Sequence, residues 1–167
     1  MLHFRDSRVS LATGVLAAAA SLLAFVYFLR RDELLLYGDA VAHLNIARRV
    51  FDSRTPGLLQ LGTVWLPLPH LLQMPFVYSD WLWRTGVGGS IVSMASFVAG
   101  TLGVLRLARG LGTGGAAWLA AVIFAANPNL LYLQATAMTE PLYLALWVWT
   151  LVYFFEFAAN ARRLEPK

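Results

Sequence analysis

The chain has 167 residues, of which 59% are hydrophobic and 13% charged, and its mean hydropathy is +0.62. Soluble domains usually contain roughly 45–50% apolar residues, so this composition predicts an integral membrane protein. There is no cysteine, which excludes disulfides and thiolate metal sites. The net charge of +4 is not gathered into a basic block interleaved with aromatics. We therefore expect membrane lipids as partners and no nucleic acid.

Four apolar segments predict four transmembrane helices in a single membrane domain covering residues 1–167. They extend over residues 10–29, 85–105, 113–133 and 140–159, each near the length of about 20 residues that crosses a bilayer. A cleaved signal peptide is the alternative for the first segment, because Arg5 and Arg8 precede it. Its apolar run is longer than the usual 7–15 residues of a signal peptide, which favours a retained anchor.

The arginines and lysines of the short connections predict the orientation. They precede the first span, separate the second from the third, and follow the fourth: Arg5, Arg8, Arg106, Arg109, Arg162, Arg163 and Lys167. The connection between the third and fourth spans, residues 127–139, has none. We therefore expect a multi-pass protein of the cell (inner) membrane with both termini in the cytoplasm and the loop over residues 30–84 outside.

The second span contains small residues spaced four apart. The pairs are Gly86 and Ser90, Gly89 and Ser93, and Ser96 and Gly100. Such a pattern lets neighbouring backbone approach closely, so we interpret it as a packing surface and not as a site.

The outer loop over residues 30–84 is too apolar for an unstructured connection and predicts two amphipathic helices at the membrane surface. The first begins at Gly38-Asp39, with Asp39 as the N-cap. Its apolar residues recur at helical spacing: Val41, Leu44, Ala47 and Phe51. The second lies in "WLPLPHLLQMPFVY", which begins at Trp65.

The same loop carries most of the candidate polar residues. Asp39 and His43 share a helix face at a spacing of four, which suits a phosphate or a metal but is more often a surface pair. His70 is either an interfacial histidine or a ligand. Arg48 and Arg49 can contact phosphate or only anchor the helix in lipid headgroups.

Glu140 begins the fourth span in "TAMTEPLYLALW". An acid followed by proline is good helix-start chemistry, and the topology also places Glu140 at the outer face together with Asp39. An acid at membrane depth is costly and is a candidate functional residue. Glu156, near the inward end of the same span, needs only a paired or snorkelling role beside Arg162 and Arg163.

Three stretches together resemble the N-terminal part of the GT-C-type polytopic glycosyltransferases. They are "YGDAVAHLNIARRVFDS" after the first span, "QLGTVWLPLPHLLQMPFV", and "NPNLLYLQATAMTEPLYLALW". The group includes the protein O-mannosyltransferases, the aminoarabinose transferases and the oligosaccharyltransferases. The resemblance covers nearly the whole chain and implies sugar transfer from a polyprenyl-phosphate carrier at the outer face.

By this resemblance, Asp39 is the general base toward the acceptor hydroxyl or, in some relatives, a ligand of a divalent metal. Glu140 lines the same cavity as a second acid. Transfer from a lipid phosphate also needs cations near the leaving group, and His43, Arg48, Arg49 and His70 are the candidates. We assign no metal ligand and no certain cofactor.

The chain departs from the group in its number of spans, since the group's core contains further helices that help to form the carrier site. We therefore expect a truncated or split module that works with a partner membrane chain. The alternative is a non-catalytic subunit derived from this fold, which packs on a larger membrane complex through its small-residue and aromatic faces.

Overall fold

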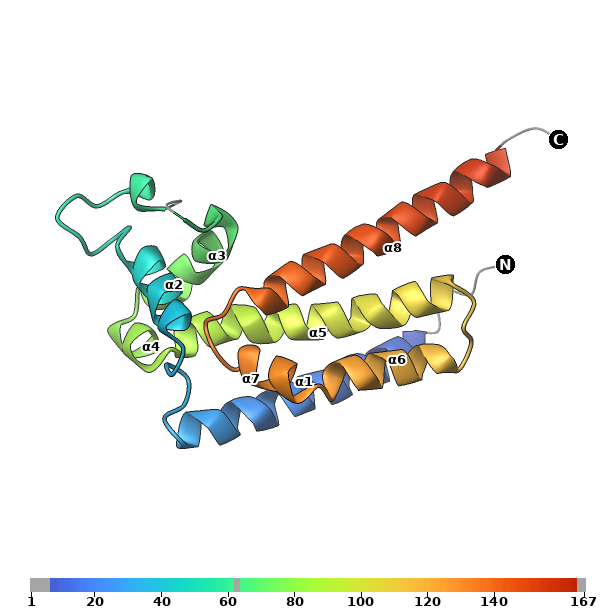
Figure 1. Ribbon diagram of the computed structural model, residues 1–167, viewed down its shortest axis with the longest axis horizontal. Helices are drawn as coiled ribbons and strands as arrows, with labels where there is room; N and C mark the ends of the chain where they lie inside the picture. Colours follow the sequence, from blue (N-terminus) through green and yellow to red (C-terminus); the bar gives the residue numbers. More distant parts are fainter. Residues whose placement is uncertain (1–6, 62–63, 165–167) are drawn as a thin grey trace.

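The computed structural model describes residues 7–61 and 64–164, and every regular element among them is a helix. Three helices are long and apolar enough to cross a membrane: α1 (Ser7–Arg30), α5 (Val87–Gly110) and α8 (Glu140–Leu164). The predicted all-α class and membrane character therefore hold at this level. Figure 1 shows that α1 begins and α8 ends at the same end of the molecule.

The predicted third span, residues 113–133, is not one continuous helix. It consists of α6 (Ala116–Ala125) and α7 (Pro128–Leu133), which are separated at Asn127. The side-chain oxygen of Asn127 accepts the backbone N–H groups of Asn129 (3.0 Å) and Leu130 (3.2 Å) and so caps α7. Pro128 has no N–H to continue the hydrogen-bond ladder of α6. The "NPN" sequence therefore ends one helix and starts another.

The outer loop folds into α2 (Gly38–Arg48), the single turn η1 (Leu58–Gln60), α3 (Pro67–Val77) and α4 (Asp80–Thr85). Figure 1 shows these elements gathered at the end of the bundle where α1 ends and α5 begins. Leu44 and Ala47 of α2 form a small core with Val77 of α3. The expected single apolar face of α2 is thus divided, because Val41 and Phe51 remain exposed.

Helix α3 buries its polar face and exposes its apolar face, which is the reverse of a surface helix in a soluble protein. It buries His70, Gln73 and Val77, whereas the leucines of its other face are exposed. These exposed leucines are Leu68, Leu71 and Leu72. The polar groups of α3 therefore point into the protein, and its apolar face points away from it.

The small residues of α5 form a packing surface, as the sequence predicts. Gly89 contacts Ala137 so closely that a side chain there would overlap it. The hydroxyls of Ser90 and Ser93 donate to the backbone carbonyls of Ala135 (2.7 Å) and Met138 (2.8 Å). The non-helical segment between α7 and α8 is in this way fixed against α5.

At the opposite end of the bundle, α5 is tied to its neighbours by its last arginines. Arg106 makes a two-point ion pair with Glu156 of α8, at 2.7 and 3.0 Å, and Arg109 donates to Ser10 of α1 at 3.0 Å. The charge of Glu156 is thus paired within the bundle by Arg106. Arg5 and Lys167, and the side chains of Arg162 and Arg163, lie outside the described residues.

Replacing Gly89 with alanine should destabilise the fold, because the added methyl group overlaps Ala137. Overpacking of this kind typically costs about 1–3 kcal/mol. The melting temperature of the full chain in detergent micelles measures the effect. The matched control is Gly14→Ala in α1, where the nearest side-chain atom, from Leu102, is 3.6 Å from the new Cβ. Equal stability of the two variants would contradict the close packing at Gly89.

Candidate functional site

Two buried histidines meet at the end of the bundle. Nδ1 of His43 on α2 lies 2.9 Å from Nε2 of His70 on α3. Their exposed fractions are only 2% and 0%. The expected surface pair is therefore wrong for His43, and both alternatives for His70 stay predictions. Apolar neighbours of α2, above all Ala40, Leu44 and Ala47, turn the His43 face inward.

The two predicted acids flank His43. Asp39 is exposed in the first turn of α2, and Glu140 is the first residue of α8. The charges of both carboxylates act on His43. The charges of both acids therefore reach His43, and a cavity shared by Asp39 and Glu140 stays a prediction. One oxygen of Glu140, Oε2, is buried and has no hydrogen-bond partner among the described residues.

The predicted N-cap role of Asp39 is wrong. Helix α2 already begins at Gly38, so that Tyr37 and not Asp39 occupies the N-cap position. Asp39 instead lies within the first turn, where a carboxylate interacts favourably with the helix dipole. Its side chain is thus not required to cap the helix and is accessible at the surface.

Burial dominates the acid–base properties of both imidazoles. Burial, and after it the neighbouring His43, lowers the pKa of His70 to about 4. Burial also lowers the pKa of His43, although the charges of Asp39 and Glu140 oppose that decrease. Both rings are therefore neutral near pH 7 and interact with ligands through hydrogen bonds, not through a positive charge.

Arg48 is held by partners within the protein. Its guanidinium donates to the carbonyls of Val77 (2.9 Å) and Tyr78 (2.8 Å), pairs with Asp52 and Asp80, and lies over the ring of Trp83. All three of its nitrogens thus have protein acceptors. These contacts join α2 to the turn between α3 and α4. The phosphate contact predicted for Arg48 stays a prediction.

Arg49 has a different environment. It is exposed and lines a groove of about 530 Å³ along α2. Trp65, Trp83 and, from α2, Asn45 also line this groove. The charge of Arg49 also lowers the pKa of His70, so the groove adjoins the histidine pair. Arg49 is therefore the predicted cation best placed to meet a ligand phosphate there.

Aromatic residues orient the polar groups of this groove. The indole N–H of Trp83 donates to the side-chain oxygen of Asn45 at 3.1 Å, which leaves the Asn45 amide N–H₂ for a ligand. The ring of Trp65 meets that of His43 edge to face, with centroids 4.8 Å apart. The groove thus combines an aromatic wall with hydrogen-bond donors, an arrangement that suits a phosphorylated polar headgroup.

The described residues contain no group of three or more histidines, aspartates or glutamates placed to hold a metal ion. The resemblance allows Asp39 to be a metal ligand, but the described residues provide no full set of ligands around it.

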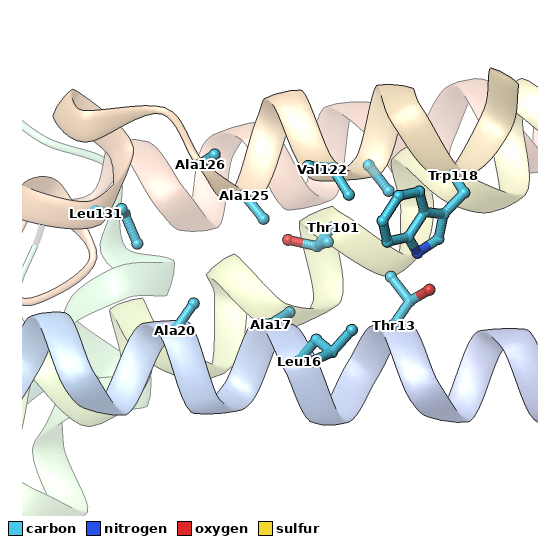
Figure 2. A pocket seen from close by; sticks show the side chains of 11 residues that line it. Thr13, Leu16, Ala17, Ala20, Thr101, Trp118, Val122, Ala125, Ala126 and Leu131 are labelled. Atoms are coloured by element: carbon cyan, nitrogen blue, oxygen red, sulfur yellow. The ribbon is translucent and has the colours of Figure 1, made fainter.

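A separate apolar cavity of about 370 Å³ lies between α1, α5 and α6 (Figure 2). Its walls are formed mainly by alanine, leucine and valine together with Trp118. The hydroxyls of Thr13 and Thr101 bond to carbonyls of their own helices, at 2.8 and 2.9 Å. The lining therefore offers hydrocarbon contacts and no titratable group.

Comparison with known proteins gives no relative: no protein-family model matches the chain, and no curated protein or solved structure is significantly similar to it.

Four residues of the site were not foreseen from the sequence: Asn45, Trp65, Trp83 and Gln73. Gln73 follows His70 by three residues, and that spacing is a signal for a shared buried face on one helix. The other three are brought together by the packing of α2 on α3 and α4, for which no local pattern exists.

Replacing Arg48 with lysine should loosen the α2–α4 end, because an ammonium group cannot reproduce the branched contacts of the guanidinium. Hydrogen bonds to charged groups typically contribute about 1.5–3 kcal/mol, and we expect a loss of this order. Amide hydrogen exchange of α2 and α3 measures it. Arg49→Lys is the matched control at the next position and should leave exchange unchanged. Similar protection in both variants would show that Arg48 does not tie these helices together.

Proposed function

We propose that the chain is a GT-C-like glycosyltransferase module. It transfers a sugar from a polyprenyl-phosphate carrier to an acceptor hydroxyl at the outer face of the cell membrane. One observation carries this proposal: His43 is buried against His70 at 2.9 Å, and the charges of Asp39 and Glu140, from distant parts of the sequence, act on it. A pair of carboxylates around a histidine provides the proton transfer that such a reaction needs. Further helices or a partner membrane chain complete the module.

Each residue of the site takes one role in this reaction. Asp39, accessible at the surface, takes the proton of the acceptor hydroxyl, and Glu140 is the second acid of the cavity. Arg49 contacts the carrier phosphate and stabilises the negative charge that develops as it leaves. His43 and His70, being neutral, contribute hydrogen bonds beside it. Arg48 supports the site by holding α2 against α3.

An apolar groove beside the site is suited to the hydrocarbon chain of the carrier. It has a volume of about 430 Å³ and lies between α3, α5 and α8. Its α3 wall, Leu72 and Phe76, flanks the buried Gln73, and its α8 wall begins at Leu142, two residues after Glu140. The groove is thus lined by residues close in sequence to Gln73 and Glu140, and it follows the apolar helices α5 and α8.

The membrane arrangement that goes with this function has four crossings. We assign the third of these to α6 and α7 together, since α6 alone, with 10 residues, is too short for a bilayer. Helices α2 and α3 lie in the outer interface with the exposed leucines of α3 toward lipid. Arg8, Arg106 and Arg109 are placed on the cytoplasmic side, together with both termini.

A second candidate function is that of a non-catalytic subunit in a larger membrane complex. The observation that favours it is the aromatic surface of α8, which exposes large side chains over most of its length. These residues are Tyr143, Trp147, Tyr153, Phe154, Phe155 and Phe157. Such a surface fits a neighbouring membrane helix as well as lipid.

Replacing Asp39 with asparagine should reduce sugar transfer about 10²–10⁴-fold, the range typical for loss of a general base. The assay uses membranes that contain the full chain and its partner, with a radiolabelled polyprenyl-phosphate sugar. The matched control is Asp32→Asn, an exposed aspartate in the turn after α1.

Unchanged transfer in Asp39→Asn would remove Asp39 from catalysis. If neither the wild type nor any variant transfers sugar, and the chain is recovered from mild detergent in a fixed ratio with another membrane protein, the subunit function is correct instead.

A further inference from the structure

The connection between α2 and α3 exposes large apolar side chains. Leu58 and Leu59 of η1 are 63% and 99% exposed, and Val64 and Leu66, on the limb that leads to α3, are 85% and 80% exposed. We call these four residues the leucine tip. Single apolar residues at a surface need no explanation, but a group of this size marks an interaction site.

The first limb of the tip is a turn closed by polar contacts. The backbone N–H of Gly57 donates to the carbonyl of Val50 at 3.0 Å, and the φ angle of Gly57, 140°, favours glycine. The side-chain amide of Gln60 donates to the carbonyl and the hydroxyl of Thr55, at 2.8 and 2.9 Å. The polar groups of the turn are thus bonded to each other, while the two leucines between them are left at the surface.

The second limb is joined to the polar site. Trp65 lies between Val64 and Leu66, and its ring meets the ring of the buried His43 edge to face, with centroids 4.8 Å apart. Trp65 also lines the groove that contains Arg49. Whatever holds the leucine tip therefore also holds one wall of that groove.

The charge pattern around the tip favours lipid over a protein partner. Between Asp52 and Asp80 the sequence contains no acid and one arginine, the exposed Arg54. Protein interfaces have a polar rim, and leucine and valine are under-represented among the residues that dominate their binding energy. A lipid leaflet instead offers hydrocarbon to apolar side chains and phosphate to a neighbouring arginine, and its negative surface disfavours acids.

The place of the tip in the fold agrees with this choice. Figure 1 shows η1 to the side of the bundle and, along its length, at the level of α2 and α4, the elements beside the end of α1 and the start of α5. The exposed residues Leu68, Leu71 and Leu72 of α3 follow Leu66 directly in the sequence and extend the apolar surface.

We propose that the leucine tip inserts into the hydrocarbon of the leaflet at which α1 ends and α5 begins, with Arg54 at the level of the lipid phosphates. Insertion fixes the depth of Trp65 and with it the depth of the groove at Arg49. The proposal needs the membrane-spanning helices but not the transfer of sugar.

Because the chain has no cysteine, a nitroxide spin label can be attached at one chosen position of the full chain. The label is placed at Leu59→Cys in vesicles of phosphatidylethanolamine and phosphatidylglycerol. Its collision rates with oxygen, which enters hydrocarbon, and with a water-soluble nickel chelate are measured by electron paramagnetic resonance. Leu23→Cys, exposed on α1, is the control for lipid, and Arg54→Cys is the control on the same loop outside the hydrocarbon.

We expect the label at position 59 to resemble that at position 23, with oxygen collisions exceeding nickel collisions, and the label at position 54 to be more accessible to nickel. Nickel collisions that exceed oxygen collisions at position 59 would show that the tip lies in water. Low rates with both reagents there would show that a protein covers it. Either result would overturn the proposal, whether or not the chain transfers sugar.

A second variant tests whether the apolar side chains cause the insertion. Leu59→Asp adds a charge at a side chain that is almost fully exposed, so the fold and its melting temperature in detergent should not change. With the label at Val64→Cys, we expect Leu59→Asp to raise nickel collisions and to lower oxygen collisions, because the charge withdraws the tip from hydrocarbon. Leu59→Ile is the matched control and should leave both rates unchanged. Equal rates in Leu59→Asp and Leu59→Ile would contradict insertion driven by the tip.

Discussion

The arrangement of this chain depends on how it satisfies the backbone of the non-helical segment between α7 and α8. Unpaired N–H and C=O groups are costly among membrane helices, where no water replaces the missing partners. Ser90 and Ser93 of α5 donate to two of its carbonyls, Gln73 of α3 reaches a third, at Ala137, and Gly89 leaves room for the close approach. The segment is thereby fixed against α5 and α3, and α8 must begin beside them. This is the reason that the charge of Glu140 acts on His43.

The same packing gives the site its chemical character. Helices α2 and α3 turn polar side chains toward each other, and burial keeps the imidazoles of His43 and His70 neutral. Charge is left to the groups at the margin, where Asp39 and Arg49 are exposed. Neutral hydrogen-bonding groups inside and charged groups outside are suited to moving a proton while an anionic headgroup remains at the surface.

Part of this arrangement could be predicted from the sequence, because long apolar runs and helix-start residues are local signals. The spans at α1, α5 and α8 and the position of Glu140 at a helix start followed from them. The break at Asn127-Pro128 had a local signal as well, but the apolar residues around it outweighed that signal. The histidine pair had none: His43 and His70 meet only because Leu44 and Ala47 pack on Val77, and such packing depends on the whole fold.

The pKa of His43 reports most directly whether the two acids and the histidine share one site. Each carboxylate stabilises the imidazolium, so removing either charge should lower the pKa of His43. NMR titration of the full chain labelled with ¹⁵N-histidine measures the pKa of His43. The variants are Glu140→Gln and Asp39→Asn, with Asp32→Asn as the control. We expect a decrease in the first two variants and none in the control. An unchanged pKa of His43 in Glu140→Gln would show that α8 does not bring its acid to the site.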